Sequence, residues 1–370
     1  MAVYKIFPSK DSTIYSIQPE LNAGRDEILE VSVKNVSSVA GLTDNVNNPS
    51  KDDIRRTLLY FAESDINTIK TLADDNFKAN LRLYLANAEN LSQDYTIECY
   101  PVSQNWAMGT GKFNDNPQTQ NGVSWKKTGY TNESIEWNSI YGTEEYLFTT
   151  GGGTWNETYL VTQSFEYTTD KDLNLNITPI LTQWYSSSIE NYGLILKHEP
   201  TIELNTGSYI DLKYFSIDTH TIYPPCIDFK WDDSLYNTGS VNAGIISSGD
   251  FVLNVSNNLG EFKKDTKYNF QIKARDKFPQ RQFTTSSVYL NWKYLPITSY
   301  WGLQDFKTTE MVVDFDTEYT KISANTTGNY FTVYMNGLQP ERTYKLLVKT
   351  ILQNSEEIVV DNDILFKIVR

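Results

Sequence analysis

One stretch of the chain, residues 172–197, constrains the fold more than any other part of the sequence. It opens with Leu173, Leu175 and Ile177, which are separated by polar residues. This period of two is typical of a β-strand with one buried face. The stretch closes on an apolar run at residues 192–196, which we interpret as a second strand. The residues between the two strands therefore decide how they are joined.

The connection carries the signals of a short helix. Thr178 can cap a helix, and Pro179 fits the first helical turn because no backbone donor is needed there. Ile180, Leu181 and Trp184 then recur at helical spacing. We therefore predict a strand, a two-turn helix that places Trp184 on a core, and a second strand, which together form a plug across the end of a β-sandwich.

Strand-forming residues dominate the whole chain. Aromatic residues make up 14% of it, and Tyr, Phe, Val, Ile and Thr all favour strands. A length of 370 residues suits two or three domains. The apolar pattern lapses at residues 233–249. We predict an all-β protein: a large antiparallel, jelly-roll-like β-sandwich at residues 1–233, then an Ig-like or fibronectin-like β-sandwich at residues 234–370. Whether the second part is one sandwich or two small ones stays open.

A motif in the second part supports the Ig-like prediction. Leu338 is followed by Pro340 and then by Tyr344, which begins the alternating run YKLLVK. This spacing is typical of a tyrosine corner, in which the phenol bonds a nearby backbone group at the turn between two sheets. We interpret all three residues as structural.

The net charge and the N-terminal sequence limit the classes of partner and the compartment that can be expected. Lys and Arg number 32 against 46 Asp and Glu, a net charge of -14, which argues against nucleic acid and against an anionic membrane surface. The N-terminal residues MAVYKIFPSKD lack the pattern of a signal peptide, and no run is long enough to span a membrane. Cys99 and Cys226 lie inside apolar strand patterns and favour two buried thiols. We expect synthesis in a reducing cytoplasm.

No catalytic constellation is recognisable, and we expect no enzyme activity. The two histidines, His198 and His220, have no Ser or Cys nucleophile at a familiar spacing and are too few for a zinc site. Several carboxylates at strand ends can be read either as a Ca²⁺ site or as a solvated acidic rim, and we favour the rim. These are Asp11, Asp26, Asp228, Asp232 and Asp233.

The long irregular segment at residues 103–153 is where binding residues are expected, because long loops commonly carry function. Gly151–Gly153 near its end is expected to be a flexible turn. Three interpretations of its tryptophans, and of Trp155 just after it, stay open: packing within the core or the loop, contact with another subunit, or stacking on sugar rings. The candidates are Trp106, Trp125, Trp137 and Trp155.

Residues 1–233 resemble the DNRLRE family, also known as carbohydrate-binding family 96, whose fold is a β-sandwich. The matching pieces follow that family's order: FPSKDSTIY, NAGRDEILEV, RRTLLYF, NLRLYLANAE, YTIECYPVSQNWAMGTGKF, GVSWKKTG, residues 172–197, and YFSIDTHTIYPPCIDFKWDD. The resemblance implies a buried Arg-bearing strand at residues 55–61. The excursion at residues 103–153 departs from the family pattern.

The chain as a whole resembles virion proteins of tailed bacteriophages. A sandwich followed by Ig-like strands, an acidic chain and the lack of a leader are the cues. This resemblance implies a structural component of the neck, tail or fibre-attachment region, made in the host cytoplasm and assembled with other virion proteins as a homo-oligomeric ring or another multi-copy array. The alternative is a module that binds a host surface glycan for adsorption.

Overall fold

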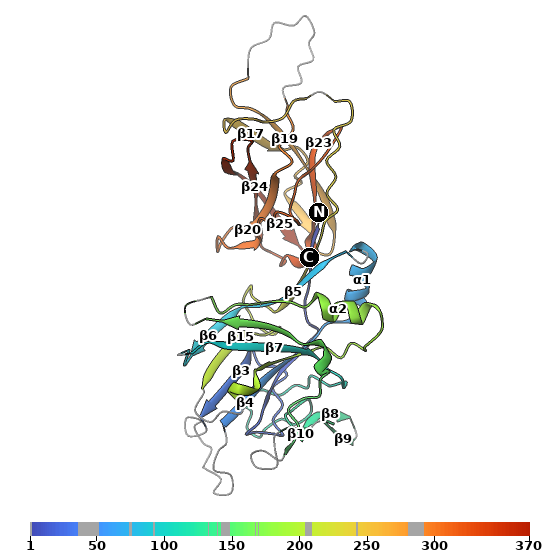
Figure 1. Cartoon of the computed structure of the whole chain (residues 1–370), viewed down its shortest axis with the longest axis vertical. Helices are drawn as coiled ribbons and strands as arrows, with labels where there is room; N and C mark the ends of the chain where they lie inside the picture. The colour runs from blue at the N-terminus through green and yellow to red at the C-terminus, as the bar shows by residue number, and fades with distance from the viewer. Residues whose placement is uncertain are drawn as a thin grey trace, which may run out of the picture. The chain divides into compact units, whose positions relative to one another are not determined.

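The computed structural model is an all-β protein, with 46% of residues in strands and 9% in helices (Figure 1). It describes residues 2–35, 52–73, 76–91, 93–131, 133–138, 140–141, 149–166, 168, 170–203, 209–241, 243–279 and 292–370. The chain forms two compact units. The N-terminal unit comprises Ile6–Asp75 and Ala79–Asp228, and the C-terminal unit comprises Met1–Lys5, Asn76–Lys78 and Phe229–Arg370.

The division between the units differs in detail from the boundary expected at residue 233. It falls between Asp228 and Phe229, inside strand β16 (Cys226–Trp231), and two short segments from earlier in the chain belong to the C-terminal unit. Nothing in the local sequence marks this division, because the apolar pattern of a strand continues across it.

The N-terminal unit is built on an eight-stranded sheet of order β12-β7-β14-β4-β3-β15-β6, with β2 paired to β4. Its strands are β2 (Lys10–Tyr15), β3 (Ile28–Asn35), β4 (Asp52–Tyr60), β6 (Leu85–Glu89), β7 (Tyr95–Pro101), β12 (Val161–Phe165), β14 (Leu194–His198) and β15 (Ile210–Phe215). A four-stranded sheet has the order β1-β16-β5-β13, with β1 (Ala2–Ile6), β5 (Lys78–Leu83) and β13 (Leu173–Asn176). The expected alternation is seen in β13, whose two leucines are buried while its two asparagines are exposed.

The central strands β4, β7 and β14 are buried on both faces. Side chains alternate across a strand, so neighbouring residues point to opposite sides of the sheet. One set includes Leu58, Ile195 and Tyr100, which lie opposite one another across the three strands and pack with tryptophans of the excursion. The other set, which includes Cys99 and Leu196, is buried as well. The buried positions include charged side chains, such as Arg56 of β4 and Glu98 of β7, which therefore need partners inside the unit.

Short elements complete the N-terminal unit. The helices are α1 (Glu63–Ala73), α2 (Thr178–Tyr185) and α3 (Pro200–Glu203). The excursion contains two small antiparallel pairs, β8 (Lys127–Thr131) with β9 (Glu133–Glu136) and β10 (Ile140–Tyr141) with β11 (Thr149–Thr150). A 3₁₀ turn, η2 (Glu157–Tyr159), follows it. Helices α1 and α2 lie next to each other (Figure 1), and Lys70 Nζ of α1 donates to the carbonyl of Tyr185 at 2.7 Å.

The short helix expected after residue 177 is present as α2, with Pro179 in its first turn and Trp184 buried. The prediction that Thr178 caps this helix is wrong. The N-cap position is Ile177, which offers no side-chain acceptor. The Thr178 hydroxyl instead accepts from the Ala79 amide at 2.9 Å and bonds Asn176 Oδ1 at 2.6 Å. The threonine therefore joins α2 to strand β5.

The C-terminal unit is one Ig-like β-sandwich. One sheet has the order β17-β19-β23-β22 and the other β18-β25-β24-β20-β21. In chain order this is the A-B-E-D sheet facing the sheet that contains strands C, F and G of an Ig domain. The strands are β17 (Phe251–Val255), β18 (Glu261–Lys263), β19 (Lys267–Asp276), β20 (Ser299–Asp305), β21 (Met311–Val313), β22 (Ser323–Asn325), β23 (Gly328–Tyr334), β24 (Thr343–Ile351) and β25 (Glu357–Val369), with a 3₁₀ turn η3 (Met335–Gly337).

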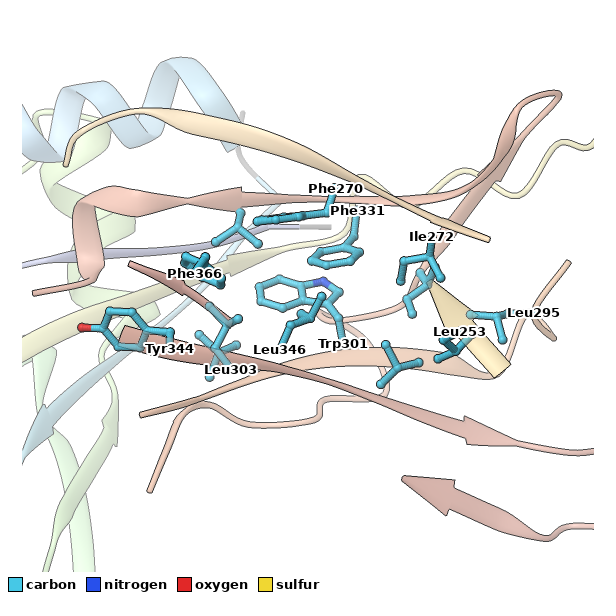
Figure 2. Close-up of a cluster of buried hydrophobic side chains, with 14 of the residues drawn as sticks. Leu253, Phe270, Ile272, Leu295, Trp301, Leu303, Phe331, Tyr344, Leu346 and Phe366 are labelled. Atoms are coloured by element: carbon cyan, nitrogen blue, oxygen red, sulfur yellow. The ribbon is translucent and has the colours of Figure 1, made fainter. Parts of the chain in front are cut away.

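Stacked aromatic rings fill this sandwich. Phe331 lies between Phe270 and Trp301, at centroid distances of 5.5 and 5.1 Å (Figure 2). Tyr344, the second residue of β24, is buried, and its hydroxyl accepts from the Gln339 amide at 2.7 Å. This is the backbone contact of a tyrosine corner. Leu338 is buried in the same core, and Pro340 lies in the turn between them.

Candidate functional site

A pocket of about 440 Å³ opens in the N-terminal unit. Its volume lies in the range of small-ligand sites. It lies between α1, the end of β4 and the segment that joins α2 to β14. The lining residues are Tyr60, Glu63, Ile66, Asn67, Asn105, Trp184, Ser187, Ile189, Glu190, Asn191 and Tyr192.

The lining is apolar and aromatic at depth and polar at the rim. Ile66 and Trp184 are buried, and Tyr60 and Tyr192 are half-buried. The exposed rim residues carry only carboxylate, amide and hydroxyl groups, and they are Glu63, Asn67, Asn105, Ser187 and Glu190. Such a surface offers both hydrogen-bond donors and acceptors around an apolar floor.

The segment after α2 is held against β4 by hydrogen bonds. Asn191 Nδ2 donates to the carbonyl of Phe61 at 2.9 Å, and its Oδ1 accepts from the Gly193 amide at 3.0 Å. Gly193 has a φ of +94°, and a Cβ there would lie 2.2 Å from the carbonyl oxygen of Leu59. Only glycine allows this close approach. The Tyr192 carbonyl accepts from Trp106 Nε1 at 2.9 Å. This wall of the pocket is therefore fixed in place.

One polar group of the lining has no protein partner. Trp184 is 7% exposed, and its Nε1 makes no hydrogen bond with any residue that the structure describes. Buried indole N–H groups usually find an acceptor, because a desolvated donor costs free energy. In the same lining, the Tyr192 hydroxyl donates to the Glu190 carboxylate.

A buried charged network supports the excursion that carries Trp106. Arg56 is 0% exposed and forms a bidentate pair with Glu203 of α3, at 3.0 and 2.7 Å. Its Nη1 donates to the carbonyl of Gly152 at 2.5 Å. The guanidinium also lies over the rings of Trp125 and Trp155, at 4.9 and 5.1 Å from their centroids. One arginine thus joins the sheet, α3 and the excursion.

A second cation extends the network. Lys197 of β14 donates to Glu98 at 2.8 Å and lies 3.8 Å from the Glu203 carboxylate. Tyr100 donates to the same Glu98 at 3.1 Å. The neighbouring His198 is buried on the opposite face of β14, and desolvation lowers its pKa to about 4. The imidazole is therefore neutral at physiological pH, with Nε2 3.1 Å from the Val31 carbonyl oxygen.

The structure decides among the three interpretations of the candidate tryptophans. Trp106, Trp125 and Trp137 are 4%, 2% and 2% exposed and share one cluster with residues of the large sheet. Trp155 is half-buried, and its ring lies tilted by 35° against that of Tyr100, at 5.7 Å between centroids. The expectation that these residues present an interface or a glycan-stacking surface is wrong for the first three. Their apolar rings are used to pack the excursion onto the sheet.

Gly151–Gly153 form a packed turn and not the flexible one expected. All three are buried and have positive φ angles. A Cβ on Gly152 would lie 2.7 Å from Arg56 Nη1, and one on Gly151 would lie 2.3 Å from the Trp125 carbonyl oxygen. Because these residues lack a Cβ, the backbone can approach Arg56 closely enough for the Gly152 carbonyl to accept its hydrogen bond. This bond holds the turn in place.

The five carboxylates considered for calcium do not gather. Within the described part of the chain, no group of three His, Cys, Asp or Glu side chains is placed to hold a metal ion. Asp11 accepts from the Ile217 amide at 2.7 Å, and desolvation raises its pKa to about 7. Asp26 accepts from the Phe113 amide at 3.1 Å, and burial raises its pKa to about 6.

The remaining carboxylates have separate surroundings. Asp228 pairs with Arg82 at 3.3 Å, whereas Asp232 and Asp233 are exposed. His220 is exposed in the loop before β16. Cys99 and Cys226 are buried free thiols, and desolvation raises the pKa of Cys99 well above its usual range.

Sequence reasoning missed the rim of the pocket. Glu63 and Asn67 lie one turn apart on the exposed side of α1, whereas the sequence suggests only a single helical turn at residues 66–75. Their only local signal is that spacing, because residues four apart share a helix face. Asn105 and Glu190 come from distant segments and reach the pocket only through the fold.

Comparison with protein-family models finds no model that matches the chain, and comparison with curated proteins finds no match. The resemblance of residues 1–233 to the DNRLRE family therefore stays a prediction. Among the described residues, no helix has both the length and the apolar character needed to cross a membrane.

Proposed function

We propose that this chain is a non-enzymatic structural component of a tailed-bacteriophage virion, in the neck, tail or fibre-attachment region, and that it assembles by subunit contacts into a ring or another multi-copy array. One observation carries the proposal. The described residues of the excursion are anchored to the large sheet by buried tryptophans and by Arg56, which bonds both Gly152 and Glu203. Such anchoring holds a surface still, which is what a building block of a particle requires.

The C-terminal unit offers the apolar side chains for such contacts. Among the described residues, seven of the nine most exposed large apolar side chains belong to this unit, and all are at least 48% exposed: Leu235, Ile245, Leu259, Phe278, Ile297, Phe306 and Val359. Burying apolar area gains roughly 25 cal/mol per Å², less the cost of association. We therefore place the subunit contacts on the Ig-like unit and not on the tryptophans of the excursion.

The test is a mass-spectrometric and cryo-EM inventory of purified particles from the phage that encodes the chain. We expect an ordered, multi-copy component. Leu259→Ser and Phe306→Ser should lower incorporation, whereas Ile135→Ser, which removes an exposed apolar side chain from the N-terminal unit, should not. Absence of the chain from purified virions would refute the proposal.

A second candidate function is recognition of a host surface glycan, and the pocket beside α1 favours it. Its aromatic floor and amide-rich rim are suited to a ligand with both apolar and hydroxyl-bearing faces. Saturable binding in a glycan array, with the intact chain as the probe, would support this function.

A further inference from the structure

We propose that the pocket beside α1 binds an ammonium group carried on an apolar stem, of the kind that a lysine side chain or a small aliphatic diamine offers. All of the lining belongs to the N-terminal unit. The inference goes beyond the proposed virion role and does not depend on it. It also assigns to the pocket a different class of ligand from a glycan.

The charge of the lining favours a cation. Glu63 and Glu190 both lie at the rim, and the lining set, all of it in the described part of the chain, contains no Lys or Arg. Neither carboxylate forms an ion pair with a described residue. Glu190 accepts a hydrogen bond from the Tyr192 hydroxyl, which leaves its negative charge in place. An ammonium group would supply the counter-charge that the rim lacks.

The cations beside the pocket are already engaged. Lys10 is not part of the lining, and its Nζ lies 4.5 Å from the centroid of the Tyr60 ring and donates to the Trp106 carbonyl at 3.1 Å. Lys70 of α1 donates to the Tyr185 carbonyl at 2.7 Å. Both lysines therefore bond carbonyl oxygens, and the rim keeps its two negative charges.

The side chains below the rim suit both the cation and its stem. Tyr60 and Tyr192 are half-buried, and the face of an aromatic ring attracts a cation that lies over it. Lys10 over the Tyr60 ring makes the same kind of contact within this unit. Ile66 and Ile189 offer apolar surface on which methylene groups can pack. A ligand with an apolar stem and a charged end would therefore contact both parts of the lining.

The rim also matches the hydrogen-bonding capacity of an ammonium group, which has three donors and no acceptor. Beside the two carboxylates, the side-chain amides of Asn67 and Asn105 each offer a carbonyl oxygen. An uncharged alkyl group of the same shape would leave these acceptors without a donor, and an anionic ligand would meet two like charges. The lining therefore selects for the ammonium group and not for the stem alone.

The pocket is small, and one of its walls is fixed in advance. The hydrogen bonds of Asn191 and of the Tyr192 carbonyl hold the segment after α2 before any ligand arrives. Binding therefore orders little of the protein, which lowers its entropic cost. A volume of about 440 Å³ suits one side chain with its adjoining backbone, or one small amine.

Calorimetric titration of the full chain at low salt tests the proposal with four probes. Two carry the ammonium group: the capped peptide acetyl-Ala-Lys-Ala-amide, and cadaverine. Two lack it: the same peptide with norleucine, which keeps the stem without the charge, and the same peptide with glutamate. The lysine peptide or cadaverine should bind, and added salt should weaken that binding. The norleucine peptide should bind about tenfold more weakly or not at all, and the glutamate peptide should not bind.

Variants of the lining test the location. Glu63→Gln and Glu190→Gln should each weaken binding of the ammonium probes about threefold, and the double variant about tenfold. Asp65→Asn removes an exposed charge from the same turn of α1 outside the lining. It is the matched control and should change the affinity less than about twofold. Ile189→Trp should abolish binding by filling the pocket, although both carboxylates remain. Thermal melting shows that each variant is folded.

The outcomes separate the parts of the inference. Equal affinity for the lysine and norleucine peptides would refute recognition of the ammonium group. Binding that survives both the double carboxylate variant and Ile189→Trp would refute the location. Binding of cadaverine alone supports the inference and identifies a free amine as the ligand, whereas binding of the lysine peptide identifies a lysine of a partner polypeptide.

A neutral oligosaccharide serves as a further probe of the same pocket. If it binds more tightly than the ammonium probes, and the carboxylate variants leave its affinity unchanged, the ligand class is refuted and the second candidate function is supported. If neither ammonium probe binds, the inference is refuted and the virion proposal stands.

Discussion

Replacing Arg56 by Met is the sharpest perturbation of the N-terminal unit. The change keeps much of the aliphatic volume and removes the guanidinium. That group makes two hydrogen bonds to Glu203, one to the Gly152 carbonyl, and contacts with two tryptophan rings. Glu203 would remain buried, and its nearest remaining cation would be Lys197, 3.8 Å away. The variant therefore leaves the Glu203 carboxylate desolvated and without its bidentate partner.

The expected loss follows from the geometry. Breaking a buried ion pair by removing one partner costs about 3–5 kcal/mol, most of it from the charge left behind. Typical domains have a free energy of unfolding of about 5–15 kcal/mol, so the unit should still fold but with much reduced stability. With a urea dependence of about 2–3 kcal/mol per M, the midpoint should fall by roughly 1–2 M. Arg56→Lys should cost less, because it keeps the charge and loses the bidentate geometry.

Urea unfolding, followed by hydrogen exchange and mass spectrometry, measures how much each segment of the chain loses stability in the Arg56→Met variant. Protection should fall in β4, β14 and α3 and stay unchanged in β24 of the C-terminal unit, which serves as the internal control. A double-mutant cycle with Glu203→Met should give a coupling of about 2 kcal/mol or more, since removing both charges also removes the orphaned one. The pair does not anchor the excursion if Arg56→Met lowers the free energy of unfolding by less than about 1 kcal/mol. The same conclusion follows if the effects of Arg56→Met and Glu203→Met simply add in the double variant.

Three further predictions concern glycine, pH and the tyrosine corner. Gly152→Ala should lower the free energy of unfolding of the N-terminal unit, measured in urea, by about 1–3 kcal/mol, because its Cβ would meet Arg56. Gly260→Ala is the control, since Gly260 has the same φ of +81° and open space around it. An equal loss in both variants would refute the steric reasoning. Asp11 has a pKa of about 7 when folded against 3.8 unfolded, so its contribution to stability falls as pH rises from about 4 to 7. Asp11→Asn should therefore raise the melting temperature at pH 8 and change it little at pH 4, and the opposite order would contradict the burial argument. Tyr344→Phe should cost the C-terminal unit about 1–3 kcal/mol in thermal unfolding, because a buried amide loses its acceptor; an unchanged melting temperature would argue against the corner.

Much of the fold was predictable from patterns within a few neighbouring residues. The alternation at residues 173–177 predicted a strand with one buried face, and the spacing from Leu338 to Tyr344 indicated a corner between two sheets. Both are signals within a few residues, and the structure contains the all-β fold that they predict. The Ig-like arrangement of the C-terminal unit follows the same rhythm of strands and turns.

The same local rules failed for the tryptophans. A Trp in a long irregular segment is equally compatible with solvent, a partner or the interior of its own chain. Trp125 and Trp137 are buried because Leu58 and Ile195, which are distant in sequence, present an apolar face for them to cover. Composition cannot reveal which face of which strand remains to be covered.

The sequence by itself determined the strand periodicity, the Ig-like unit and the short helix before β14, since each depends on side chains that are neighbours along the chain. Only the tertiary structure decided the Arg56–Glu203 pair and the pocket beside α1, whose members are brought together over separations of more than 100 residues. The physical reason is that such contacts depend on strand register and on loop closure, and both are settled by the burial of the whole unit and not by any local pattern.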